Sequence, residues 1–267
     1  MTEPAVGHAS RLDTTVAHSA RLWNYFLGGK DHFSVDRFAG GKVLAVLPEL
    51  ATSARACRAF LGRAVRHLTR EVGIRHFLDI GTGLPTANST HEVAQSVAPE
   101  SRILYVDNDP MVLAHARALL TSTVEGRADY LEADLRDIES ILTVARETLT
   151  FDEPVAVVLL GVLDFLPADD EAYGVMRKLV EGIPSGSHVV VSHPTREVNP
   201  SAVDRAFDLW NAHGCTPISA RTPAAIERFF EGLELLDPGV VSCSQWRPDK
   251  GADTAPVIDF AGVGRKP

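Results

Sequence analysis

Short apolar runs alternate along the chain with longer segments in which apolar residues recur at helical spacing. The apolar runs lie at 77–80, 102–107, 130–133, 155–161, 188–192, 234–236 and 256–263. Alternating strands and helices predict an α/β fold with a doubly wound, mostly parallel sheet and right-handed crossovers. The run at 155–161 is the most apolar, so we expect it at the centre of the sheet. No helical segment separates the last two runs, and these two strands are therefore predicted to pair antiparallel.

The first 72 residues depart from this alternation. Residues 1–20 are small and polar without periodicity, which predicts a flexible tail. Residues 21–40 carry five aromatic side chains and a glycine pair, and 51–72 has the apolar stripe of one helix that ends at Gly73. The predicted organisation is a tail at 1–20, an N-terminal helical segment at 21–72 and one domain at 73–267.

The aromatic part of the N-terminal segment has two interpretations. Trp23, Tyr25 and Phe26 could form one apolar helical face that docks on the core. The same segment could form a lid over a bound ligand, with a turn at the glycine pair and at His32 after it. The two roles are compatible.

The run at 77–80 ends in a glycine turn. Gly81 and Gly83 follow it directly, and glycines there let the backbone take positive φ and approach a ligand closely. Asp79 precedes the turn, and Asp107 ends the next apolar run. An acid at the tip of that strand is placed to accept hydrogen bonds from a ribose, so the pattern predicts a nucleoside site.

Two classes of nucleoside cofactor could occupy such a site. A dinucleotide needs free backbone N–H groups facing its pyrophosphate, but Pro85 removes one N–H and Thr86 stands where a third glycine would be. S-adenosylmethionine carries a sulfonium and an ammonium and no phosphate, so an acid such as Asp79 beside the glycines favours it. A nicotinamide cofactor is the weaker alternative.

Composition narrows the class of protein. The 267 residues are 45 % hydrophobic, which is ample for one large α/β domain, and no apolar run is long enough for a membrane span. The start of the chain lacks the features of a signal peptide, so we expect a soluble, cytoplasmic protein. A net charge of −9 disfavours nucleic acid as a partner and favours a small-molecule substrate. Three scattered cysteines, and histidines without HxH or HExxH spacing, predict no disulfide framework and no metal site.

Six stretches carry a more specific signal: ARLWNYFLGGKDHFSVDR, RAFLGRAVRHL, FLDIGTGLPT, YVDNDPMVLAHARALL, FFEGLELLDPGVV and WRPD. Together they resemble the S-adenosyl methyltransferase family, a bacterial group long catalogued as a domain of unknown function. This family belongs to the class I, Rossmann-like methyltransferases, and the resemblance covers nearly the whole chain. It implies a seven-stranded methyltransferase sheet and S-adenosylmethionine as the cofactor, but no particular substrate.

The resemblance also implies roles for single residues. The general motif places Gly81 and Gly83 against the methionine part of the cofactor, Asp79 near its ammonium and Asp107 on the ribose hydroxyls. The other implied cofactor-binding residues are Asn108 beside the ribose, Asp134 and Leu135 at the adenine, Gly161 and Val162 below the methyl group, and Asn24, Tyr25 and Arg58 in the N-terminal segment. From the residues alone, Asp134 has an alternative role as the cap of a helix that starts at Arg136.

A methyl acceptor that is a hydroxyl or a protonated amine needs a base to take its proton. The candidates are His193 after the fifth strand and Asp164 just beyond the fourth, both at the cofactor edge of the sheet. Each has a structural alternative: His193 as a hydrogen-bonded residue before Pro194, and Asp164 as part of a solvated loop. His32 has only the lid interpretation in its favour.

The predicted function is methyl transfer from S-adenosylmethionine to a small molecule. The run after the fourth strand lacks the Asn-Pro-Pro-Tyr pattern of enzymes that methylate exocyclic nucleobase amines or glutamine amides, and no Pro-Cys pair indicates cytosine C5 chemistry. Since no base stands out, a non-catalytic sensor of the same cofactor is an alternative. A nicotinamide-dependent oxidoreductase is the other, which Pro85 and Thr86 disfavour.

Overall fold

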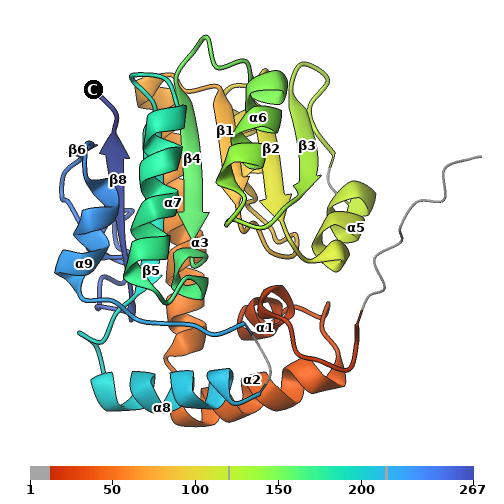
Figure 1. Cartoon of the computed structure of the whole chain (residues 1–267), viewed down its shortest axis with the longest axis vertical. Coiled ribbons are helices and arrows are strands. Elements are labelled where there is room, and N and C mark those ends of the chain that lie inside the picture. The colour runs from red at the N-terminus through yellow and green to blue at the C-terminus, as the bar shows by residue number, and fades with distance from the viewer. Residues whose placement is uncertain (1–12, 120, 214–215) are drawn as a thin grey trace, which may run out of the picture.

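The computed structural model describes residues 13–119, 121–213 and 216–267, and its centre is one mixed sheet (Figure 1). The sheet has eight strands in the order β3-β2-β1-β4-β5-β8-β6, and β7 pairs with β8 outside this path. Strands β1 to β5 are parallel, and β8 runs antiparallel to β5, β6 and β7. The strands are β1 (His76–Ile80), β2 (Arg102–Asp107), β3 (Arg127–Glu132), β4 (Val155–Leu160), β5 (His188–Pro194), β6 (Glu234–Leu235), β7 (Val241–Ser242) and β8 (Asp259–Arg265).

This topology confirms the predicted α/β fold, with its parallel centre, antiparallel last strands and N-terminal helices. The run predicted to be central, at 155–161, lies as β4 between β1 and β5. The short strand β7 was missed, because two residues are too few to show a period in the sequence.

Helices cover both faces of the sheet. On one face lie α6 (Ile138–Leu149) and α7 (Asp169–Gly182), packed on Leu78 and Ile80 of β1. On the other lie α3 (Leu50–His67) and α4 (Thr90–Val97), packed on Phe77. Helix α5 (Pro110–Leu119) contacts β2 and β3, and α9 (Pro223–Glu227) lies near β8. Because side chains alternate along β1, Asp79 points to the face that α3 and α4 cover.

Three more helices form a layer beyond the carboxyl ends of the parallel strands, at the bottom of Figure 1. They are α1 (Ser19–Phe26), α2 (Ser34–Val46) and α8 (Pro200–Asn211), and they share a hydrophobic cluster that includes Phe26, Val43 and Trp210. Helix α1 thus begins just before the predicted boundary at 21, while most of the predicted tail lies outside the described residues. None of the helices in the described ranges is long and apolar enough to cross a membrane.

Two buried carboxylates hold α1 in place. His18 Nδ1 lies 3.0 Å from Asp109 Oδ2, and Arg21 Nε lies 3.7 Å from the same oxygen. Asp36 of α2 accepts hydrogen bonds from the backbone N–H groups of His18 (3.0 Å) and Phe33 (2.7 Å). Since Asp109 immediately precedes α5, these contacts fix α1 between α2 and the end of β2.

Candidate functional site

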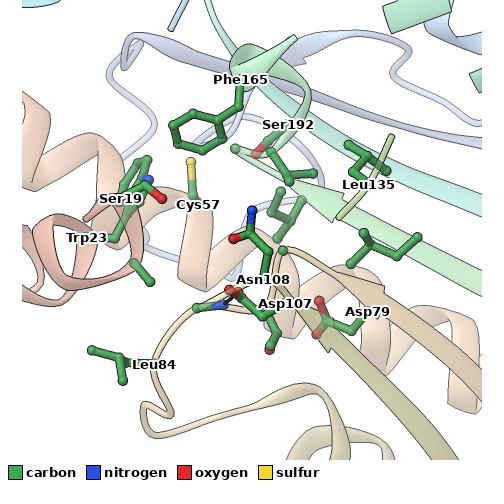
Figure 2. Close-up of a pocket in the computed structure, with 18 of the residues that line it drawn as sticks. Ser19, Trp23, Cys57, Asp79, Leu84, Asp107, Asn108, Leu135, Phe165 and Ser192 are labelled. Carbon is green, nitrogen blue, oxygen red and sulfur yellow. Dashed lines mark hydrogen bonds between the residues drawn. The ribbon is translucent and has the colours of Figure 1, made fainter. Parts of the chain in front are cut away.

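A pocket opens at the carboxyl ends of β1, β2, β3 and β4, under α1 (Figure 2). Its walls come from the glycine turn after β1, from the residues that follow β2, β3 and β4, and from α1 and α3. The empty space in it is about 1270 Å³, including the part open to solvent.

The two glycines of the turn after β1 differ in their surroundings: Gly81 is closely packed against the protein, whereas Gly83 faces open space. Gly81 has φ +74°, and a Cβ there would lie 2.5 Å from Val162 Cγ2, so only glycine lets the turn lie against the loop after β4. Gly83 has φ +66°, and a Cβ there would meet no atom within 4 Å. The turn is therefore anchored at Gly81, while the backbone at Gly83 faces open space.

Asp79 is a buried carboxyl in the wall beside this turn. The hydroxyl of Thr90, the first residue of α4, donates to Asp79 Oδ2 over 2.5 Å. Burial raises the pKa of Asp79 to about 6, and the nearby Asp107 adds to this, while Thr90 and Arg58 act in the opposite direction. A bound cation would stabilise the ionised form of this carboxyl.

Arg58 of α3 lines the same end of the pocket. Its Nη2 donates to the carbonyl oxygen of Asn88 over 3.2 Å, whereas its Nε is buried and has no hydrogen-bond partner among the described residues. Burial lowers the pKa of Arg58, and the charge of Asp79 opposes that effect. Asp79 and Arg58 thus offer opposite charges at one end of the pocket, which suits the ammonium and carboxylate of an amino acid.

Asp107 ends β2 and shapes the turn as well as lining the pocket. Its Oδ2 accepts from the N–H of Gly83 and its Oδ1 from the N–H of Asp109, each over 2.9 Å. Burial raises its pKa. Next to it, Asn108 Nδ2 donates to Asp134 Oδ2 over 3.4 Å. The ends of β2 and β3 therefore place two carboxylates and an amide along one wall.

The alternative role of Asp134 as a helix cap is wrong. Helix α6 begins at Ile138, and its N-cap is Asp137, whose side chain accepts from the N–H of Ser140. Asp134 lines the pocket and accepts from the N–H and guanidinium of Arg136 in the turn before that helix.

The wall under α1 is aromatic. The indole of Trp23 lies against the loop after β4, where a Cβ on Gly161 would be in ordinary contact with Trp23 Cζ2 at 3.4 Å. Asn24 lines the pocket, and its Oδ1 accepts from the N–H of Asp31 over 2.9 Å, which holds the turn after α1. Trp23 and Phe165 both border the pocket (Figure 2). The three aromatic residues of α1 therefore do not share one face: Phe26 is buried in the hydrophobic cluster with α2 and α8, whereas Trp23 borders the pocket.

The structure brings eleven of the twelve predicted cofactor-binding residues to this pocket: Asn24, Arg58, Asp79, Gly81, Gly83, Asp107, Asn108, Asp134, Leu135, Gly161 and Val162.

Tyr25 is the exception, and its predicted place in the pocket is wrong. Two residues along a helix correspond to a turn of about 200°, so Tyr25 points away from the side that Trp23 presents. Its ring lies against α2, where a Cβ on Gly40 would be 2.6 Å from Tyr25 Cδ1, and stands edge-on to the ring of His32 at 5.3 Å. His32 is likewise outside the pocket lining, with Nε2 3.0 Å from the carbonyl oxygen of Gly29.

His193 is also misplaced by the sequence prediction. Its side chain is fully buried outside the pocket, where Arg221 donates to Nε2 over 2.8 Å and Nδ1 lies 2.9 Å from the carbonyl oxygen of Pro194. Burial lowers its pKa to about 3. Side chains alternate along β5, so Ser192 lines the pocket and His193 faces away. His193 has the structural role, not that of a base for a molecule in this pocket.

Asp164 is buried, so its assignment to a solvated loop is also wrong. It lies in a short 3₁₀ turn after β4 and is 4 % exposed. It borders a smaller hollow next to the pocket, and its Oδ1 has no hydrogen-bond partner among the described residues. Burial, together with the charge of Asp259, raises its pKa to about 7.

Sequence reasoning missed several residues of the pocket wall. Phe165, Cys57, Ser192 and Asp259 border it, and all of them come from outside the glycine and strand-end motifs. No local pattern marks these four residues. Trp23, which also borders the pocket, differs from them because the aromatic density of the N-terminal segment indicates a lid as one of its two interpretations. Among the described residues, no group of three or more His, Cys, Asp and Glu side chains could hold a metal ion.

Two solved structures match the chain over nearly its whole length. A DUF574 family protein from Streptomyces avermitilis is 46 % identical, with a TM-score of 0.91, over 96 % of this chain and 100 % of the other. A protein from Thermobifida fusca to which methyltransferase activity is ascribed is 38 % identical, with a TM-score of 0.86, over 98 % and 99 %.

A third structure, human N-acetylserotonin methyltransferase in complex with S-adenosylmethionine, shares the fold at 15 % identity, with a TM-score of 0.50, over 91 % of this chain and 62 % of the other. No curated protein matches the chain. The model of a family described as S-adenosyl methyltransferase matches residues 5–267. The chain therefore belongs to the S-adenosyl methyltransferase family and is a methyltransferase that depends on S-adenosylmethionine.

Proposed function

We propose that the pocket binds S-adenosylmethionine along the strand ends and that the enzyme transfers its methyl group to a small molecule. The observation that carries this proposal is the gathering of eleven predicted cofactor-binding residues around one pocket. The order of the strands matches the order of the parts of the cofactor, with the adenine at β3, the ribose at β2 and the amino-acid end at β1.

Each part of the cofactor meets groups of suitable chemistry in this arrangement. Asp79 receives the ammonium, and the unpartnered Nε of Arg58 receives the carboxylate. Asp107 accepts from the ribose hydroxyls, Asp134 accepts from the adenine amino group, and Leu135 covers the ring. The carboxylates beside the turn would repel a pyrophosphate, which is a further reason to prefer this cofactor to a dinucleotide.

When bound, S-adenosylmethionine supplies a methyl group on a sulfonium, and its transfer is an in-line displacement. The protein then contributes mainly by holding the two reactants in line. Trp23 and Phe165 cover the side of the pocket next to Gly161 and exclude water there, while Gly161 and Val162 form the floor. Because α1 closes over this wall, a small acceptor fits more readily than a polymer segment.

The test uses cofactor with a deuterated methyl group and a cell extract divided by ultrafiltration. We expect the enzyme to label a compound in the low-molecular-weight fraction, detected by mass spectrometry. Asp107→Ala is expected to lose both the labelling and the calorimetric binding of S-adenosylmethionine. The matched control is Asp137→Ala, which removes a helix cap outside the pocket and should keep both. Label confined to macromolecules would contradict the small-molecule acceptor, and unchanged binding by Asp107→Ala would contradict the site.

A further inference from the structure

A second hollow lies next to the cofactor pocket and shares two lining residues with it, Trp23 and Asp259. Its empty space is about 390 Å³, open solvent included. It lies among α1, α2, α8 and the strand ends, in the layer that Figure 1 shows beyond the sheet. The residues that define its chemistry are the aromatic Trp23, Phe26, Phe207 and Trp210 and the carboxyls of Asp164 and Asp259.

The position of this hollow follows from the order of the strands. The proposed cofactor runs from β3 over β2 to β1, and the next strands in the same direction are β4, β5 and β8. Asp164 follows β4, Pro194 ends β5 and Asp259 begins β8, and all three border the hollow. It therefore lies on the side of the cofactor away from the adenine, where an acceptor has to be.

The carboxyl of Asp164 is only partly compensated: its own backbone N–H and the charge of Arg221 lower its pKa, but burial and the charge of Asp259 outweigh them. Asp164 Oδ1 is buried without a hydrogen-bond donor among the described residues. Arg221 is the nearby cation, but its guanidinium is paired with the carboxylate of Asp169 at 3.0 Å. It also donates to His193 and to the carbonyl oxygens of Leu163 (3.3 Å) and Leu166 (2.7 Å). An ionised carboxyl in such a place is costly unless a ligand brings a donor or a positive charge.

Asp259 adds a second buried carboxyl to the same hollow. Ser53 donates to its Oδ2 over 2.5 Å, so it has a partner, and burial raises its pKa. The rings of Phe207 and Trp210 lie among the hydrophobic residues around it. Carboxyls together with aromatic faces favour an organic cation, because ring faces attract positive charge and the apolar walls contact its hydrocarbon part.

We propose that this hollow is the acceptor site, that the acceptor is a small amine bound as its ammonium with an apolar body, and that Asp164 receives the ammonium proton. The inference rests on the proposed methyltransferase function. A neutral alcohol would leave the buried carboxyl without a counter-charge, so the hollow is selective for amines over alcohols of the same shape.

The chemical step balances with these groups alone. Asp164 takes one proton from the ammonium, and the freed lone pair on nitrogen forms the bond to the methyl carbon. The carbon–sulfur bond breaks with its electron pair left on sulfur, which becomes a neutral thioether. The product is a methylated ammonium, and the proton on Asp164 later passes to solvent. A pKa of Asp164 near 7 suits a group that takes up and releases a proton at neutral pH.

The experiment measures binding and needs no turnover. Protein saturated with S-adenosylhomocysteine is titrated at about pH 8 with 2-phenylethylamine and 2-phenylethanol, and with isobutylamine and isobutanol; at this pH Asp164 is mostly ionised and the amines are still protonated. We expect the better-bound amine to bind at least about tenfold more tightly than its alcohol, as expected for a buried charge pair. Asp164→Asn should remove this preference and leave alcohol binding in place. The matched control Asp170→Asn changes an exposed carboxyl near the start of α7 and should keep the preference.

The wild-type comparison decides the proposal even if Asp164→Asn fails to fold. Equal binding of amine and alcohol in both pairs, tighter binding of the alcohols, or no binding of any probe would overturn the amine site. A preference that persists in folded Asp164→Asn would overturn the role of Asp164. If S-adenosylhomocysteine itself does not bind, the proposed function fails, which this titration detects in its first step.

Discussion

Replacing Asp79 by asparagine should change protein stability and cofactor binding in opposite directions. The substitution removes a buried carboxyl but keeps the size of the side chain and an oxygen that can accept from Thr90. In the folded protein the pKa of Asp79 lies above its ordinary value, so folding favours the protonated form. The stability of the wild type therefore falls as pH rises through the interval from about 4 to about 6, and stays lower above it.

The size of this effect follows from the pKa values. A rise from 3.8 to about 6 corresponds to about 3 kcal/mol at pH 7, at about 1.36 kcal/mol per pH unit. The side chain is only 6 % exposed, so solvent does little to screen this energy. Asparagine stays neutral at every pH, and Asp79→Asn should therefore raise the free energy of unfolding by up to about 3 kcal/mol at pH 7, and by less than about 1 kcal/mol at pH 4.

Cofactor binding should respond in the opposite sense. A hydrogen bond to a charged group contributes about 1.5–3 kcal/mol, so losing the contact with the ammonium should weaken binding by about tenfold to a hundredfold. Urea denaturation of both proteins between pH 4 and pH 8 and calorimetric titration with S-adenosylmethionine give the two quantities. An Asp79→Asn protein that is less stable than wild type at neutral pH, or that binds the cofactor equally well, would refute the reasoning.

Three further predictions concern the walls of the pocket. Gly81→Ala should lower the free energy of unfolding, measured in urea, by more than about 2 kcal/mol, because its Cβ would overlap Val162. Gly83→Ala would meet no atom, so it should cost only the about 1–2 kcal/mol of holding alanine at a positive φ. Equal losses of stability in the two variants would contradict the close packing at Gly81. Trp23→Leu should speed the release of S-adenosylhomocysteine in stopped-flow fluorescence, because a leucine covers less of the pocket next to the loop after β4 than the indole does. An unchanged release rate would show that the indole does not cover the ligand. Affinity for the cofactor should fall below about pH 6 as Asp79 is protonated, and a calorimetric series with no change between pH 5 and pH 8 would contradict this role.

Much of the fold was predictable because strands buried between two helical layers are almost wholly apolar. Strand β4, with the sequence VAVVLL, has the most apolar run of the chain and lies at the centre of the sheet. The layer formed by α1, α2 and α8 could not be placed in the same way. The partners Phe26 and Trp210 lie far apart in the sequence, and no local pattern shows that their rings meet at 6.3 Å.

In the candidate site, too, residues placed by the strand order were predictable, whereas residues placed by the direction of a side chain were not. Asp79, Asp107 and Asp134 lie at or just beyond the carboxyl ends of parallel strands, and topology alone brings such strand ends to one edge of the sheet. Where the outcome depended on which way a side chain points, the sequence was a poor guide. A shift of one position along β5 separates Ser192 in the pocket from His193 in the core.

The sequence also did not predict which polar loop residues are buried. Asp164 follows an apolar strand in what appears in sequence as an ordinary polar turn. It borders a hollow together with Asp259 and residues of α8, and the N–H of Ser219 donates to its carbonyl oxygen; all of these come much later in the chain. Such contacts between distant segments carry no local signal.

The most direct test of the account is a calorimetric titration of the purified protein with S-adenosylmethionine, S-adenosylhomocysteine and NAD under the same conditions. The arrangement of Asp79, Arg58 and Asp107 around the glycine turn predicts that both sulfur compounds bind with one molecule per chain and that NAD does not. Binding of NAD, or no binding of either sulfur compound, would contradict it.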